Sequence, residues 1–347
     1  MAVTLKEIAR DVGVTVVTVS KVLRGHEDIS KKTRALVLQR AKELGYRPNL
    51  TARSLVTGKS SLVGLLVPEL LHPFFAEIAR ALAENLRKQG MYLLICSSEG
   101  DPELERNQLE HLLSRGLDAI VVAPVGGDEE SLGAVVASKT LLVVVDRKIE
   151  LSRAHFIGSD DILAGEIATE HLIDIGCKRI AHIRGPNNSV GAARLEGYKR
   201  ALKKAGIPFR PELVSEVSSG DVESNRQGEA FAERLLTGAK RADGLFCHSD
   251  PMAIGAMRSA LRRGLRIPRD VAIIGCGNLH YDASLTIPLS SIDQKSEQIG
   301  HKAADLILEK TCRGKYEESP DERDEDFLDL RIRPTVVIRD STMRASS

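Results

Sequence analysis

Residues suited to nucleic-acid contact follow one another near the N-terminus, where short hydroxyl side chains, two valines and a lysine share one segment. Hydroxyl and ammonium groups bond phosphate oxygens and base edges, and small apolar side chains can touch thymine methyl groups. The segment therefore predicts a DNA-contacting set. Its members are Thr15, Val16, Val17, Thr18, Ser20 and Lys21.

A second group of polar and aromatic residues follows apolar runs further along the chain, where strands would end. It comprises Phe74-Phe75, Asp146-Arg147, Asp160-Asp161, Arg194 and Ser249-Asp250. Carboxylates and guanidinium groups that bond neighbouring hydroxyls, with an aromatic face beneath, are typical of sugar sites. Simpler interpretations stay open for four of these residues: Asp161 and Asp250 as helix N-caps, Phe75 as core and Arg194 as a surface residue.

The first group needs a helix to present it, and the flanking residues predict two short helices joined by a tight turn. Thr4 and Glu7 form a capping-box pattern that opens the first helix, and Gly13 ends it. Ala9, Gly13 and Val19 stand where a helix-turn-helix needs a small residue, a glycine and a β-branched residue. The spacing favours a helix-turn-helix over an arbitrary helical pair.

Ser30 predicts the cap of a third helix over residues 33–44, and three helices alone are also typical of small bundles without a DNA role. The charge distribution favours a DNA-binding role for this segment. Residues 1–60 contain twelve Lys or Arg against five acids, although the whole chain has a net charge of only +1. A basic module followed by an acidic body is typical of a polyanion binder with a separate sensing unit.

From residue 61 the pattern changes to short apolar runs that alternate with amphipathic helices. Such alternation predicts parallel sheets covered on both faces, and its length exceeds one comfortable core. We therefore expect two α/β lobes with a ligand bound between them, at the carboxyl ends of strands.

Composition excludes several other classes. The 347 residues, 42% hydrophobic and 28% charged, are typical of a globular protein of two or three domains. We find no apolar run that would cross a bilayer and no signal-peptide pattern, and the five dispersed cysteines suggest free thiols, so we expect a cytoplasmic protein.

Two motifs resemble nucleotide sites without completing them. Gly58-Lys59-Ser60 resembles the end of a P-loop, but Arg53 stands where its first glycine belongs. Gly275 and Gly277 lack the third glycine of a dinucleotide fingerprint. We find neither an H-E-x-x-H nor a G-x-S-x-G pattern, so the sequence predicts no cofactor, no metal and no enzyme.

The sequence resembles the lactose-repressor (LacI/GalR) family of bacterial transcription regulators. The resemblance lies in residues 4–23, Gly45-Tyr46-Arg47-Pro48-Asn49, Ala52-Arg53-Ser54-Leu55, Arg194-x-x-Gly197-Tyr198 and Ile267-Pro268-x-Asp270. It implies a helix-turn-helix in the major groove and a hinge helix that pairs with its dimer mate in the minor groove. On that resemblance Leu55 is the apolar wedge that opens a base step, and Asn49, Ala52 and Arg53 are its neighbours at the groove.

The resemblance also selects effector contacts from the second group. They are Phe74, Phe75, Arg147, Asp161, Asn188, Arg194 and Asp250. Two departures affect the choice of ligand. Asp160-Asp161 stands where members commonly carry Asp-Asn, and Gly275-Cys276-Gly277-Asn278 replaces Gly-Phe-Asp-Asp, which removes two acids near the cleft. The effector of a relative is therefore not carried over to this chain.

Together these observations predict an all-α helix-turn-helix domain (1–46), a hinge and linker (47–60) and an α/β, periplasmic-binding-protein-like core (61–340). We expect the N-lobe at about 61–159 and 291–325, and the C-lobe at about 160–290 and 326–340. The predicted function is a dimeric repressor that binds a palindromic operator under control of a sugar-like effector. The alternatives are a sugar-binding receptor without a DNA role and, third, an enzyme. Residues 317–329, rich in acids, predict a solvated loop.

Overall fold

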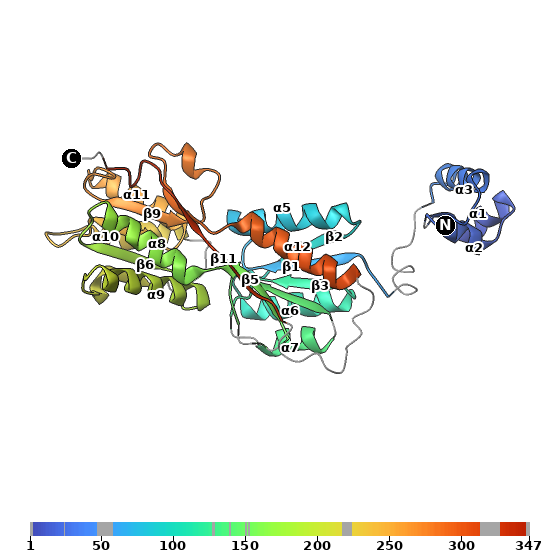
Figure 1. Ribbon diagram of the computed structural model, residues 1–347, viewed down its shortest axis with the longest axis horizontal. Coiled ribbons are helices and arrows are strands. Elements are labelled where there is room, and N and C mark those ends of the chain that lie inside the picture. Colours follow the sequence, from blue (N-terminus) through green and yellow to red (C-terminus); the bar gives the residue numbers. More distant parts are fainter. Residues whose placement is uncertain are drawn as a thin grey trace. The chain divides into compact units, whose positions relative to one another are not determined.

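The computed structural model (Figure 1) divides into two compact units, Met1–Ser60 and Ser61–Ser347. None of the helices within the described residues has the length and apolarity that a bilayer crossing requires. The described residues are 3–23, 25–46, 58–126, 129–138, 140–149, 151, 153–216, 224–312 and 327–344.

Within its described residues the first unit contains three helices: α1 (Leu5–Val12), α2 (Val16–Leu23) and α3 (Lys31–Glu43). Both partners of the predicted capping box bond at the start of α1, and Gly13 ends that helix in the left-handed conformation at φ 72°. The side chain of Ser30 caps α3 by accepting from the backbone N–H of Thr33.

The small core of this unit explains the spacing of its small residues. Ile8 and Val19 are fully buried, and Ala9 is nearly so, where α1 and α2 cross. Val37 on α3 closes the same core. The pattern of Ala9, Gly13 and Val19 thus gives the close helix crossing of a helix-turn-helix.

The second unit begins with a parallel sheet whose strand order is β11-β5-β4-β3-β1-β2. The strands are β1 (Leu62–Val67), β2 (Tyr92–Ser97), β3 (Ala119–Val122), β4 (Leu141–Val145), β5 (His155–Ser159) and β11 (Asp329–Ile332). Helices cover both faces, as near-continuous apolar strands require. Helices α5 (Pro73–Lys88) and α12 (Ser296–Cys312) pack on one face, and α6 (Pro102–Ser114) and α7 (Glu129–Ala137) on the other (Figure 1).

The second lobe repeats this architecture with the strand order β12-β10-β9-β8-β6-β7, in which β12 runs antiparallel to β10. Its strands are β6 (Ile180–Arg184), β7 (Val214–Glu216), β8 (Gly244–Cys247), β9 (Ala272–Cys276), β10 (Ser290–Asp293) and β12 (Thr335–Val337). Helices α8 (Asp161–Asp174) and α9 (Ser189–Lys204) cover one face, and α10 (Ser224–Leu235) and α11 (Asp250–Arg262) the other. The described part of this lobe also contains two short 3-10 helices, η1 (Pro211–Leu213) and η3 (Asp282–Ser284).

The chain passes between the lobes after β5, β10 and β11, and the last two passages differ from our expected boundaries. We expected residues 291–325 in the first lobe and 326–340 in the second. Instead β10 belongs to the second sheet, and β11 extends the first sheet by pairing with β5, with Asp329 opposite Phe156. The sequence has no clear signal for β11, because this short edge strand begins at the end of the acidic segment 317–329.

Candidate functional site

Helix α2 presents part of the predicted DNA-contacting set on its outer face. Val19 points into the core, whereas Val17 at the start of the helix is 63% exposed and Val16 is also exposed. Val16 and Val17 are apolar side chains on the outer face of α2, outside the buried core. Such side chains are suited to contact thymine methyl groups in a DNA groove.

The polar members of the set are held by local bonds. The Thr15 hydroxyl caps α2 by accepting from the backbone N–H of Thr18 at 3.1 Å, and lies 2.9 Å from the Thr18 hydroxyl. Ser20 is half-buried. Lys21 ion-pairs with Asp28 in the loop before α3. The four predicted minor-groove residues, Asn49, Ala52, Arg53 and Leu55, lie outside the described residues.

A cavity between the lobes of the second unit brings together five of the seven predicted effector contacts. They are Phe74, Phe75, Arg147, Asn188 and Arg194. The aromatic pair and Arg147 come from the first lobe, and the other two from the second. The cavity encloses about 30 Å³, whereas ligand sites typically hold about 300–1,000 Å³. The lobes must therefore part before a ligand of sugar size can enter.

Helix α5 positions the aromatic wall of this cavity. His72 caps the helix by accepting from the backbone N–H of Phe74 at Nδ1, and Pro73 fixes the first turn. The Phe74 and Phe75 rings meet edge to face with centroids 5.2 Å apart. This contact and the burial of both rings give a rigid apolar wall.

Arg194 forms the centre of the opposite wall. It is 3% exposed, and its Nε and Nη2 donate to Asp161 Oδ1 at 2.9 and 2.8 Å. Its Nη1 donates to the backbone carbonyl of His248 at 2.5 Å. Burial raises the pKa of Asp161, and Arg194 counteracts part of this rise. Asp161 does not line the cavity. We expected it to contact the effector, but it holds Arg194 instead.

The close crossing of α8 and α9 allows this buried pair. A Cβ on Gly165 would lie 2.2 Å from the Arg194 carbonyl, and one on Gly197 would lie 2.0 Å from the Ile162 carbonyl. Only glycine fits at either position, since real Cβ contacts essentially never fall below 3.0 Å. The two glycines thereby bring Asp161 at the start of α8 within reach of Arg194.

Asp250 is the second predicted contact that does not line the cavity. It is fully buried and turns toward the loop after β9, where its carboxylate accepts from the Ser291 hydroxyl at 2.6 Å and from the Leu279 backbone N–H at 3.2 Å. Its two oxygens lie only 2.1 and 2.6 Å from where Cβ atoms on Gly275 and Gly277 would be. Gly275 and Gly277, of which Gly277 stands where the family pattern has Asp, thus make room for this carboxylate.

Asp282, from η3, lies against Asp250 and is also fully buried. Burial, followed by the neighbouring Asp250 charge, raises the pKa of Asp282 to about 9. This pair therefore retains a proton at neutral pH, because two buried charges this close would repel each other.

The cavity also contains residues outside the predicted set. They are His72, Asp146, Val190, His248, Ser249, Cys276 and Gln294. Asp146 and Ser249 belonged to the group that the sequence placed after strands, although they were not chosen as effector contacts. His248 and Gln294 also follow strands, so the same rule could have found them. Burial and the nearby Arg194 charge hold the pKa of His248 well below its usual value, so its ring is neutral. Burial raises the pKa of Cys276 to about 12, so its thiol stays protonated.

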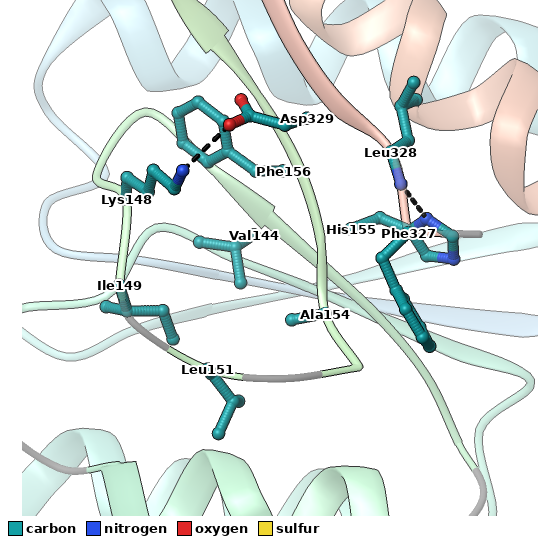
Figure 2. Close-up of a pocket in the computed structure, with 10 residues that line it drawn as sticks. All are labelled: Val144, Lys148, Ile149, Leu151, Ala154, His155, Phe156, Phe327, Leu328 and Asp329. Atoms are coloured by element: carbon teal, nitrogen blue, oxygen red, sulfur yellow. Dashed lines mark hydrogen bonds and ion pairs between the residues drawn. The ribbon is translucent and has the colours of Figure 1, made fainter. Parts of the chain in front are cut away.

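A larger cavity, of about 400 Å³, lies in the first lobe beside β4, β5 and β11 (Figure 2). Lys148 and Asp329 form an ion pair of 2.8 Å there, and Leu328 donates its backbone N–H to His155 Nδ1. None of the predicted effector contacts lines this cavity. Its walls adjoin residues 150, 152 and 326, which lie outside the described part of the chain.

A helix-turn-helix with an exposed reading face and a two-lobed α/β unit with an interlobe cavity define a class: DNA-binding transcription regulators controlled by a small molecule. Residues 4–49 match the family described as bacterial regulatory proteins, lacI family. Residues 60–327 match the periplasmic binding proteins and sugar binding domain of LacI family. The chain belongs to the LacI family of transcription regulators, and the predicted family and fold class are confirmed.

Curated relatives include the HTH-type transcriptional repressor PurR of Haemophilus influenzae (strain PittEE) and that of Pasteurella multocida (strain Pm70). Both are 32% identical, over 97% of this chain and 98% of theirs. These relatives are repressors, which confirms the prediction of a regulator rather than an enzyme. The match over residues 4–49 also sets aside the alternative of a receptor without a DNA role.

Solved structures agree over nearly the full length. The transcriptional regulator CelR in complex with cellobiose has a TM-score of 0.72 and 27% identity, over 98% of this chain and 99% of that one. The lac repressor dimer bound to operator and the anti-inducer ONPF has a TM-score of 0.83 over 99% of this chain and 100% of that one. At 22% identity, this second likeness shows the fold alone.

Proposed function

We propose that this chain is a dimeric repressor whose affinity for a palindromic operator is controlled by a sugar or sugar derivative bound between the lobes. One observation carries the proposal: five side chains chosen from sequence for sugar binding line a single interlobe cavity. CelR was solved with cellobiose, and a LacI-family regulator from Enterococcus faecium, 26% identical, with bound ribose.

In the proposed complex the sugar ring lies on the wall formed by Phe74 and Phe75. Arg147 and Arg194 donate hydrogen bonds to its hydroxyls. The side-chain oxygen of Asn188 caps α9, and its amide N–H groups donate to the sugar. Because the cavity encloses only about 30 Å³, ligand entry changes the angle between the lobes. That change moves the two hinge segments of a dimer together or apart, and a coupling of about 1–3 kcal/mol makes a useful switch.

The DNA-binding role rests on α2 in the major groove and on residues 49–57 in the minor groove. One small recognition module contacts only a half-site, so a palindromic operator calls for a dimer. The dimer would use the exposed edge of the first sheet. On this edge strand, β2, Tyr92 is 62% exposed and Ile95 is 45% exposed.

The effector site is tested with Arg147→Met, using Lys148→Met as the matched control. Lys148 is the next cation along the chain and does not line the interlobe cavity. Operator binding is followed by fluorescence anisotropy while sugars are added. Loss of one charge-assisted hydrogen bond, about 1.5–3 kcal/mol, should raise the effector concentration needed at least tenfold in Arg147→Met alone. Equal responses of the two variants would exclude this cavity as the effector site.

The wedge role of Leu55 is tested separately. Leu55→Ala should weaken binding to the operator and leave binding to unrelated duplex DNA nearly unchanged, because a wedge acts only where the minor groove opens. Equal losses on both duplexes would refute that role.

A further inference from the structure

The first lobe contains a cavity of about 400 Å³ that the proposed function does not use (Figure 2). Small-molecule sites in proteins typically hold about 300–1,000 Å³, so this cavity is large enough for a ligand of its own. Its described walls and those of the interlobe cavity have no residue in common. A ligand bound here therefore leaves the proposed effector site free.

Apolar side chains from three segments of the chain line most of this cavity. They are Val144 on β4, Phe156 on β5, Ile149 and Leu151 on the connection between these strands, and Phe327 just before β11. Ile149 and Leu151 are only partly buried against the core of the lobe. They therefore keep apolar surface that a ligand can cover, and removal of such surface from water favours binding.

Lys148 and Asp329 are the charged side chains of the described walls. Lys148 Nζ lies 2.8 Å from Asp329 Oδ2, and Arg331 Nε lies 3.4 Å from Asp329 Oδ1. These three side chains are between 38% and 45% exposed, so solvent reaches them. His155 is buried, and burial lowers its pKa to about 4, so its ring adds no charge. One carboxylate thus faces two cations, and the cluster has one positive charge in excess.

We propose that this cavity is a second ligand site, which binds a monocarboxylate with a compact apolar body such as an aromatic ring. The apolar body lies against Val144, Phe156 and Phe327, and the ligand carboxylate accepts hydrogen bonds from Lys148. The Lys148 ammonium group has three N–H donors, of which one donates to Asp329. The proposal does not rest on the proposed function, so either can fail without the other.

The charge of the cluster selects the head group of the ligand. A carboxylate balances the excess positive charge, whereas an ammonium head group would face Lys148 and Arg331. An uncharged amide can still accept a hydrogen bond but gains no charge attraction. Because the cluster is partly exposed, water screens it, and the apolar body supplies most of the affinity.

The first experiment measures binding of 3-phenylpropionate to the full chain by ligand-observed NMR. Its amide and 3-phenylpropylamine keep the ring and change the head group, and propionate keeps the head group without the ring. The acid should bind saturably, about threefold or more tighter than the amide or the amine, because a partly exposed ion pair contributes modestly. Propionate should bind at least about tenfold more weakly, because it buries little apolar surface. Equal affinity of the acid and its amide, or no saturable binding of either 3-phenylpropionate or 4-methylpentanoate, would overturn the proposal.

The second experiment locates the site with two variants and the same probes. Lys148→Met should abolish the preference for the acid and leave the affinity for the amide nearly unchanged, because it removes the charge and keeps the apolar stem. Ala154→Leu extends a half-buried side chain of the wall into the cavity. It should weaken binding of both the acid and the amide at least about tenfold, because the ligand and the new side chain cannot occupy the same space.

Each variant has a matched control that should bind the probes as wild type does. Lys88→Met removes another exposed lysine, which pairs with Glu84 and does not line the cavity. Ala230→Leu adds the same atoms at an exposed position on α10. If the preference for the acid persists in Lys148→Met, or if a folded Ala154→Leu variant binds as tightly as wild type, the ligand lies elsewhere and the proposal fails. If circular dichroism shows that Ala154→Leu does not fold, the result for Lys148→Met decides alone.

Discussion

At the scale of single residues, buried charge governs both the effector cavity and the loop behind it. Arg194 is compensated by Asp161, whereas Asp250 meets another acid, Asp282, with no cation bonded to either carboxyl group in the described residues. The ion pair with Asp161 keeps the buried Arg194 guanidinium charged in a wall of the cavity. The pair of Asp250 and Asp282 retains a proton that an exposed carboxyl group would release.

This retained proton predicts a pH-dependent stability. The folded pKa of Asp282 is about 9, far above its ordinary value of 3.8. Between these values the folded state holds a proton that the unfolded state releases, so stability falls as pH rises. Asp282→Asn should flatten this dependence and raise the free energy of unfolding by at least about 1 kcal/mol at pH 8.

Urea unfolding of both proteins between pH 5 and pH 9 measures the difference. Asp305→Asn, at an exposed position on α12, is the control and should follow wild type. A wild-type stability that rises through this range, or an Asp282→Asn variant that parallels wild type, would contradict the retained proton on Asp282.

Lys21 gives a second prediction at this scale. Lys21 forms an ion pair with Asp28, and its ammonium group has three N–H donors. The remaining N–H groups can donate to acceptors on a base edge. Lys21→Ala should relax preference at one base pair per half-site by about 1–3 kcal/mol. The measurement is a titration of operator variants. Lys32→Ala, an exposed lysine at the start of α3, should leave base preference intact. A uniform loss across all variants would make Lys21 a phosphate contact.

At the scale of elements, pairs of helices that cross closely at glycines position the functional side chains. Gly165 and Gly197 let α8 and α9 approach closely, and a Cβ on Gly228 or Gly255 would similarly meet backbone atoms between α10 and α11 at 2.1 and 1.9 Å. Each helix pair covers one face of the second sheet, so the helix spacing fixes where Arg194 and Asp250 stand at the ends of strands.

The crossing is tested by Gly197→Ala. Its new Cβ would lie 2.0 Å from the Ile162 carbonyl, so the variant should lose about 1–3 kcal/mol of stability. Gly133→Ala on α7 is the control, because no atom lies within 4 Å of its Cβ position. It should be neutral or gain about 0.5–1 kcal/mol. Equal stabilities of the two variants in chemical denaturation would contradict the close crossing.

At the scale of the whole molecule, we propose that the DNA-binding unit and the effector-binding unit work together in a dimer. The edge strand β2 has apolar side chains on its surface, which the cores of the first lobe do not use. Tyr92→Asp should therefore separate the dimer without unfolding the lobe. Sedimentation velocity is the measurement. Phe209→Asp, at a 40% exposed aromatic of the second lobe, should stay dimeric. A dimeric Tyr92→Asp variant would rule out this edge.

Local signals allowed much of the fold to be predicted from sequence. Thr4 and Ser30 act through neighbours three residues away, so their caps could be predicted, as could the alternation of strands and helices. The position of a residue after a strand identified Arg147 and Arg194 at the cavity. Asp161 and Asp250, chosen by the same rule, do not line the cavity, because their orientation depends on distant partners. Arg194 lies 33 residues from Asp161, and Ser291 lies 41 from Asp250.

We propose that the basic helix-turn-helix binds duplex DNA in a sequence-specific way. The most direct measurement is selection of genomic fragments by the purified full-length protein, followed by titration of the enriched duplex and a scrambled duplex of equal length at several salt concentrations. We expect a palindromic enriched site, bound at least about a thousandfold more tightly than the scrambled duplex, with affinity falling steeply as salt rises. Equal affinity for both duplexes would contradict it.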